Sequence, residues 1–167
     1  MPGTLALRLK RGTAITLDVE ERIPLNGITA HSGPSGSGKT TLLRALAGLD
    51  GDADAAVREI RFGASVWDDG GFSVPPEERR IGMVFQEPAL FPHLNVARNI
   101  GYGARRRQVA ATDAIVEALD LRPLMSRDVM GLSGGEARRV ALARAMASGP
   151  ALMLLGEPVA GLDAQRE

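Results

Sequence analysis

The sequence predicts an α/β fold that begins with antiparallel strands and carries a helical subdomain inserted in its second half. Three observations lead to this fold class. Apolar and polar residues alternate over residues 5–19, as in half-buried strands. A short apolar segment at 28–31 runs directly into a glycine-rich stretch and a helix. Residues 87–131 have mostly helical patterns, so the helices of the second half are expected there.

The composition is that of a single soluble globular domain. The chain has 167 residues, of which 44% are hydrophobic and 24% charged, enough for a real core. Twenty basic and twenty acidic residues cancel, so no overall field attracts nucleic acid, and we expect no nucleic-acid partner. The absence of cysteine excludes disulfides and a thiol nucleophile. No apolar run reaches the length of a signal peptide or a membrane span, so we expect neither.

The N-terminal residues predict a β-hairpin. Apolar side chains occupy every second position over 5–9 and again over 15–19, and Arg11 and Gly12 stand between the two segments. The turn at Asn26-Gly27 then leads into the expected short strand at 28–31. Each of these segments would pack one face on the core.

The residues after the glycine-rich stretch predict a helix that ends at Gly48, where a glycine suits a C-terminal cap. Its apolar face is expected to consist of Leu42, Leu43, Leu46 and Leu49. The later elements are a loop at 50–56, strands at 60–62, 65–67 and 81–85, helices within 87–131 (the clearest at 112–119), a helix within 132–148 and a fully buried strand at 151–155.

Residues 33–40 match the pattern of a phosphate-binding loop. Its glycines allow the backbone to approach phosphates closely with N–H groups turned inward, and the following helix adds its positive end. A lysine at the end of the loop would neutralise the β- and γ-phosphates, and the hydroxyl after it would bind magnesium. The alternative is a glycine-rich turn without a ligand. The residues are Gly33, Pro34, Ser35, Gly36, Ser37, Gly38, Lys39 and Thr40.

A second glycine-containing stretch, "LSGGE" at 132–136, also precedes a helix. Its exposed amides suit an anion. By itself the stretch has a simpler interpretation, in which Ser133 caps the helix and Glu136 completes a capping box.

Taken together, four segments resemble the ATP-binding subunits of ABC transporters. "GPSGSGKTT" at 33–41 is similar to their Walker A motif, "VFQEPALFPHLNV" at 84–96 to the Q-loop, "LSGGE" to the signature and "VAGLD" at 159–163 to the D-loop. The four follow the order of the family and cover nearly the whole chain. Within the family the sequence looks most like molybdate importers, with sulfate, iron and polyamine importers close behind.

The resemblance implies that ATP lies between two copies of the chain in a head-to-tail homodimer. Residues 33–41, including Thr41, would hold the phosphates of one ATP. The partner copy would close over the γ-phosphate with its signature residues, which are Ser133, Gly134, Gly135 and Glu136. Gln86 would contact Mg2+ and the attacking water, and Thr40 would bind the same ion.

Glu157 would polarise the attacking water, a role that needs a carboxylate at hydrogen-bond distance, and Asp163 would belong to the D-loop. Without the resemblance, a Glu-Pro after a strand indicates a turn. The implied partners are transmembrane permease subunits and, indirectly, a solute-binding protein. The implied location is the cytoplasmic face of the cell membrane, with 1–86 and 134–167 as the nucleotide-binding core and 87–133 as the helical subdomain.

The sequence departs from the family at two places. Relatives carry an aspartate at the position of Gly156, where it anchors the magnesium-bound water, so its loss predicts a slower chemical step. Relatives also continue with a strand and a histidine that contacts the γ-phosphate. The chain ends at Glu167, and we therefore expect a C-terminally truncated, incomplete fold.

These departures keep two alternative functions open. One is a nucleotide-binding module that has lost catalysis, which Gly156 and the missing histidine favour. The other is a soluble ATPase of the same type that acts on nucleic acid or ribosomes, against which the balanced charge argues.

Overall fold

The computed structural model describes residues 3–11, 17–49, 55–105 and 112–156. The chain divides into two compact units, Met1–Arg79 and Arg80–Glu167, which we describe separately. This partition does not test the expected division into a nucleotide-binding core and a helical subdomain, which stays a prediction. Among the described residues, no helix combines the length and the apolar character that crossing a membrane requires.

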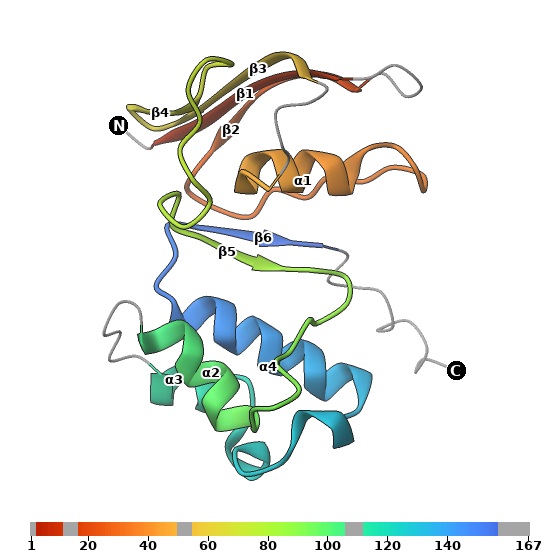
Figure 1. Ribbon diagram of the computed structural model, residues 1–167, viewed down its shortest axis with the longest axis vertical. Helices are drawn as coiled ribbons and strands as arrows, with labels where there is room; N and C mark the ends of the chain where they lie inside the picture. The colour runs from red at the N-terminus through yellow and green to blue at the C-terminus, as the bar shows by residue number, and fades with distance from the viewer. Residues whose placement is uncertain (1–2, 12–16, 50–54, 106–111, 157–167) are drawn as a thin grey trace. The chain divides into compact units, whose positions relative to one another are not determined.

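The first unit contains a four-stranded antiparallel sheet in the order β2-β1-β3-β4 (Figure 1). The strands are β1 (Thr4–Arg11), β2 (Leu17–Pro24), β3 (Ala55–Phe62) and β4 (Ser65–Asp68). Leu5, Leu7 and Leu9 are buried, whereas the intervening Arg8 and Lys10 are exposed. The structure therefore confirms the predicted hairpin and the alternating pattern of its first strand, whereas residues 15 and 16 of the predicted second strand lie outside the described residues.

Helix α1 (Lys39–Ala47) ends as the sequence predicts. Gly48 has a positive φ of 73°, and its N–H donates to the carbonyl oxygen of Ala45 at 3.0 Å. The buried face differs in part from the expected one, because alanines replace two of the leucines. The buried residues are Leu42, Ala45, Leu46 and Ala47, while Leu43 is half-buried and Leu49 is exposed.

The predicted strand at 28–31 is wrong. These residues form no strand in the structure, and the side chain of Ile28 is fully exposed, at 100%. A strand requires a hydrogen-bonded neighbour, and the described part of the chain offers none to this segment. The glycine-rich loop is therefore preceded by irregular backbone.

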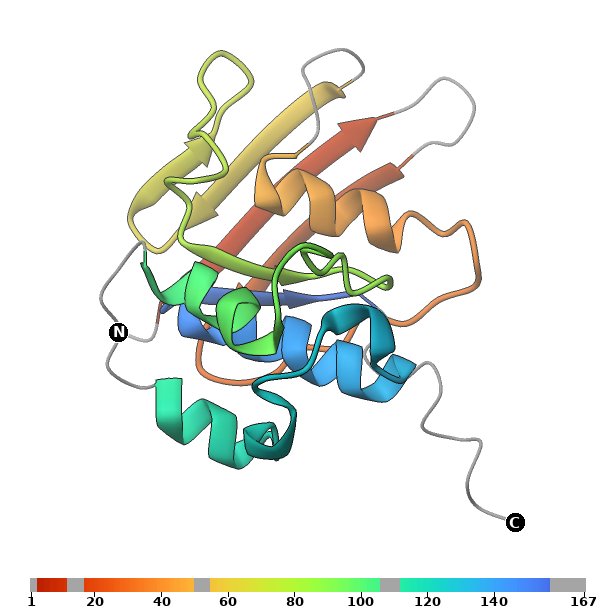
Figure 2. The same cartoon turned by 60° about the horizontal axis from the view of Figure 1, so that its bottom comes forward.

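The second unit pairs two parallel strands, β5 (Ile81–Val84) and β6 (Leu152–Leu155), which lie side by side in both views (Figure 2). Its helices form a core of their own around Val96, Ile100 and Val140. They are α2 (Val96–Arg105), α3 (Thr112–Ala118), two short 3-10 turns (Arg122–Leu124 and Val129–Gly131) and α4 (Gly134–Ala147).

Strand β6 is less buried than the sequence predicts. Leu154 is buried, but Leu155 remains 39% exposed. The two-stranded sheet gives β6 one strand neighbour among the described residues, so it is an edge strand rather than a central one. The expectation of a fully buried strand is therefore wrong.

Candidate functional site

The glycine-rich loop has the backbone conformation that its glycines permit. Gly36 and Gly38 have positive φ values of 81° and 90°, which favour glycine. A Cβ atom at Gly33 would lie 2.9 Å from the hydroxyl oxygen of Ser37, too close for a side chain without a shift. The N–H of Ser37 donates to the carbonyl oxygen of Pro34 at 3.2 Å and closes a tight turn. The positive φ values of Gly36 and Gly38 are thus the feature of the loop that favours glycine.

Lys39 places a positive charge over this loop. Its ammonium group donates to the carbonyl oxygens of Gly33 at 2.7 Å and Pro34 at 2.9 Å. Helix α1 begins at Lys39 without a side-chain cap and without an acidic residue in its first turn, and the hydroxyl-bearing Thr40 is exposed there. The N-terminal N–H groups and the lysine together suit an anion such as a phosphate chain.

The parallel pair β5 and β6 brings two predicted site residues to one edge of the second unit. Val84 pairs with Leu155, and the N–H of Gly156 donates to the carbonyl oxygen of Val84 at 2.8 Å. A Cβ atom at Gly156 would lie 3.3 Å from the backbone nitrogen of Gln86. Gln86 and Gly156 are therefore direct neighbours, as expected for residues that follow adjacent parallel strands.

The segment after Gln86 is held by helix α4. The guanidinium of Arg144 donates to the carbonyl oxygens of Ala89 at 3.0 Å and Pro88 at 3.3 Å, and it lies 5.0 Å above the ring centre of Phe91. Burial lowers the pKa of Arg144, and the neighbouring Tyr102 opposes this effect. Ala89 has a positive φ of 44°, which a non-glycine residue adopts only when its surroundings hold it.

The "LSGGE" stretch forms the capping box that its sequence predicts. The hydroxyl of Ser133 accepts a hydrogen bond from the Glu136 N–H at 3.3 Å, and the N–H of Ser133 donates to the Glu136 carboxylate at 2.7 Å. The hydroxyl also donates to that carboxylate at 2.8 Å. Gly134 and Gly135 are exposed in the first turn of α4.

Glu136 carries the negative charge at the start of α4. The hydrogen bond from the backbone N–H of Ser133 lowers the pKa of this carboxyl group, helped by the hydroxyl of Ser133 and by the charge of Arg127. Arg127 approaches the carboxylate at 3.4 Å and donates to the carbonyl oxygen of Gly131. The N-terminus of α4 is thus already compensated by a carboxylate of its own chain.

The structure leaves several predicted roles untested. Glu157 and Asp163 lie outside the described residues. Residues 33–41 come together in the first unit, whereas Gln86 and Gly156 meet at a strand edge of the second. The sequence analysis did not predict the hydrogen bonds from Arg144 to the segment after Gln86. No local pattern could have revealed them, because the partners of Arg144 stand 55 and 56 positions away.

Residues 17–160 match the family described as ABC transporter. Three curated relatives are named molybdenum import ATP-binding protein ModC. The chain is 45% identical over 154 residues to the Hahella chejuensis protein and 43% identical over 152 residues to the Escherichia coli protein. It is 43% identical over 176 residues to the Aromatoleum aromaticum protein. The alignments cover 90%, 90% and 99% of the chain, which spans only 42%, 43% and 45% of these relatives' length.

A solved structure has the same fold. It is cbiO1 from Clostridium perfringens, part of the ABC transporter complex cbiONQ. The TM-score is 0.74 with 23% sequence identity, over 95% of this chain and 67% of that chain. The likeness supports the ABC-type α/β fold with its antiparallel N-terminal sheet.

Proposed function

Since the chain belongs to the ABC transporter family, we propose that it binds and hydrolyses ATP to power an importer of molybdate or a related oxyanion. The observation that carries the ATP part is the loop at 33–38 with Lys39 at the first, uncapped turn of α1. The names of the ModC relatives support the molybdate part. The same proposal includes permease subunits as partners, an indirect role for a solute-binding protein, and a place at the cytoplasmic membrane face.

The N–H groups of the loop and of the first turn of α1 would bind the phosphates, with Lys39 neutralising their charge. Thr41 extends this set of residues into the first turn. The signature residues Ser133–Glu136 of a second copy would complete the site in a homodimer. Glu157 would accept a proton from the attacking water, Gln86 would orient it, and Asp163 would act at the dimer contact.

Magnesium fits the donors that the chain offers. The described residues contain no group of three or more carboxylate, histidine or cysteine side chains. Mg2+ at nucleotide sites needs few protein ligands, because phosphate oxygens and waters supply the others. By the resemblance to the family, the hydroxyl of Thr40 and the amide oxygen of Gln86 would be the protein ligands of the ion, which would neutralise charge on the phosphates.

Gly156 favours a second candidate function, a nucleotide-binding module with lost catalysis. A glycine at the end of β6 provides no carboxylate beside Gln86. The φ of Gly156 is not in the left-handed region, but a Cβ atom there would lie 3.3 Å from the backbone nitrogen of Gln86 and 3.4 Å from the carbonyl oxygen of Val84, so these backbone atoms would have to shift. Shifts of a few tenths of an ångström would admit an aspartate.

Single-turnover ATP hydrolysis distinguishes the two functions. We compare the chain with Gly156→Asp, with Gly156→Asn as the neutral control of equal size, and with Lys39→Ala as the baseline. Hydrolysis by the unaltered chain above that baseline supports the ATPase. Binding without hydrolysis, with activity gained in Gly156→Asp alone, supports the degenerate module. A folded chain that binds no ATP contradicts both.

The molybdate part needs a separate measurement on the chain assembled with its permease and binding protein. Hydrolysis by this complex should rise with molybdate and its binding protein, and it should not rise with sulfate. Stimulation by sulfate and not by molybdate would contradict the choice of solute and leave the ATPase assignment intact.

A further inference from the structure

Arg79 is a buried charged residue at the end of the first unit, with 1% of its surface exposed. One nitrogen of its guanidinium, Nη1, donates to the carbonyl oxygens of Ala45 at 2.9 Å and Leu46 at 2.8 Å. These carbonyls belong to the last turn of α1, where backbone partners are few; that of Ala45 also accepts from the N–H of Gly48. A cation at this end also interacts favourably with the helix dipole. Arg79 therefore caps α1 from outside the helix.

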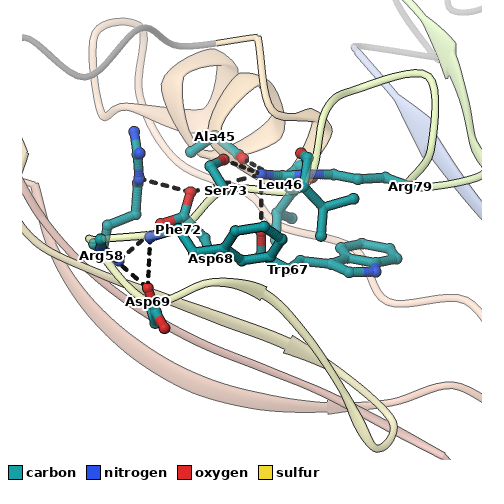
Figure 3. Close-up of polar contacts among 12 residues, drawn as sticks. Ala45, Leu46, Arg58, Trp67, Asp68, Asp69, Phe72, Ser73 and Arg79 are labelled. Atoms are coloured by element: carbon teal, nitrogen blue, oxygen red, sulfur yellow. Dashed lines mark hydrogen bonds and ion pairs between the residues drawn. The ribbon is translucent and has the colours of Figure 1, made fainter.

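The same guanidinium is tied to the sheet side of the unit (Figure 3). Its Nη2 donates to the hydroxyl of Ser73 at 2.9 Å and lies 3.6 Å from the carboxylate of Asp68, at the end of β4. Asp68 is itself buried and pairs with Arg58 of β3 at 2.7 Å. Arg79 thus joins the C-terminal turn of α1 to the β3–β4 hairpin, and its own side chain and that of Asp68 are buried.

Arg79 packs closely against the end of α1. A Cβ atom at Gly48, the C-cap of the helix, would lie only 2.9 Å from the central carbon of the guanidinium. The indole ring of Trp67 flanks the guanidinium at 5.9 Å. Burial lowers the pKa of Arg79 and the charge of Asp68 opposes this effect; an arginine so paired keeps its charge. The end of α1 is held by charge, hydrogen bonds and shape together.

The glycine-rich loop at the other end of α1 is held by the hydrogen bonds from Lys39 and by those of its own turn. Residues 31–37 are all exposed, so the loop has no buried side chain that could anchor it. The nine-residue helix is a rigid rod of about 13 Å. Movement at the end that Arg79 caps would therefore displace Lys39 at the opposite end.

We infer that Arg79 is a positioning residue for nucleotide binding, which fixes α1 against the β3–β4 hairpin and thereby places the loop at 33–38 and Lys39. The inference rests on the proposed ATP site. Arg79 itself would not touch the nucleotide. Its effect on ATP affinity would pass through the orientation of α1.

The test compares ATP affinity, measured by calorimetry, with thermal stability in Arg79→Met and Arg58→Met. Both variants remove one of the two cations that pair with Asp68, so both disturb the same buried network. Only Arg79 caps α1. We expect both variants to lower Tm, and Arg79→Met alone to weaken ATP binding, by roughly tenfold or about 1.4 kcal/mol. Measurements are made well below the lower Tm.

Arg79→Lys is the conservative variant and replaces Arg79→Met if the latter does not fold. It keeps the charge but not the planar guanidinium, so its ATP affinity should lie between that of the unaltered chain and that of Arg79→Met. Unchanged affinity in Arg79→Met, or equal losses in Arg79→Met and Arg58→Met, would overturn the inference alone. A folded unaltered chain that binds no ATP, with no difference from Lys39→Ala, would overturn the proposed function and the inference with it.

Discussion

The helices α1 and α4 both start at glycine-containing stretches, yet their first turns differ in charge. Helix α1 begins after Gly38 with no side-chain cap, and a lysine occupies its first position. Helix α4 begins after Ser133, whose capping box brings the Glu136 carboxylate onto the helix start. Two similar glycine-containing stretches thus produce one helix start without a negative charge and one at which a carboxylate of the same helix supplies a negative charge.

This difference separates two ways of binding an anion. At α1 a phosphate would meet unpaired N–H groups and an ammonium group. At α4 an anion that used the N–H or the hydroxyl of Ser133 would have to displace the Glu136 carboxylate, since that carboxylate occupies both. The first site has no carboxylate to displace. The second requires a rearrangement, such as the approach of a partner could provide.

The largest expected effect concerns ATP binding by the single chain. Lys39→Ala should weaken it by about 100-fold, because hydrogen bonds to charged groups contribute about 1.5–3 kcal/mol and about 1.4 kcal/mol is tenfold. Ser133→Ala should leave it unchanged, since α4 has no part in this step. Calorimetry on both variants checks the contrast. Equal losses in the two would show that the α4 start already binds nucleotide in one chain.

Helices α1 and α4 are also held in different ways. Two glycines in α2 test whether close packing against α2 holds α4. A Cβ atom at Gly103 would clash with the backbone oxygen of Arg144, so α2 and α4 approach closely there. Gly103→Ala should lower the free energy of unfolding by about 1–3 kcal/mol. Gly101→Ala meets nothing within 4 Å and should raise it, by up to about 1 kcal/mol.

Urea unfolding followed by the helical circular dichroism signal measures both glycine variants. A destabilised Gly101→Ala or a neutral Gly103→Ala would mean that α4 is not held by close backbone approach to α2. In that case the apolar core around Val140 and the contacts of Arg144 to Pro88 and Ala89 would hold this helix.

Sequence reasoning succeeded where the determining signal is local. The alternation in β1, the C-cap at Gly48 and the capping box of Ser133 and Glu136 depend on residues a few positions apart, and the structure has all three. The ABC-type fold was likewise predictable because its motifs are contiguous stretches. The backbone of the candidate ATP loop follows from its glycines in the same way.

Sequence reasoning failed where a distant partner decides. Arg79 is buried and its neighbour Arg80 is exposed, and Arg79 binds carbonyls of α1 that stand 33 and 34 positions away in the sequence. The expected strand at 28–31 failed for the corresponding reason, since a strand exists through its neighbour. The roles of Glu157 and Asp163 stay predictions, because both lie outside the described residues.

A smaller effect tests the cap of α4 itself. Ser133→Ala removes the acceptor for the Glu136 N–H and should cost about 1 kcal/mol of stability. Ser133→Thr keeps a hydroxyl at the same position and should cost less. Urea unfolding of the two variants measures the difference. If alanine and threonine were equivalent, the hydroxyl would contribute nothing to the helix start, and its availability to a partner would be unrestricted.

The smallest effect is a pH dependence that α4 should show and α1 should not. The backbone N–H of Ser133 holds the pKa of Glu136 below its usual value of 4.5. A lowered pKa in the folded state means that the ionised carboxylate stabilises the fold. The contribution is complete above the usual pKa and is lost as the pH falls through the lowered one.

Glu136→Gln, which can still complete a capping box, should therefore have a lower Tm than the unaltered chain at neutral pH. The two Tm values should converge once the pH falls below the lowered pKa, and salt should reduce the gap at neutral pH. A Tm gap independent of pH would assign the stabilisation to hydrogen bonding alone, and the charge contrast between the two helix starts would then have no energetic consequence at α4.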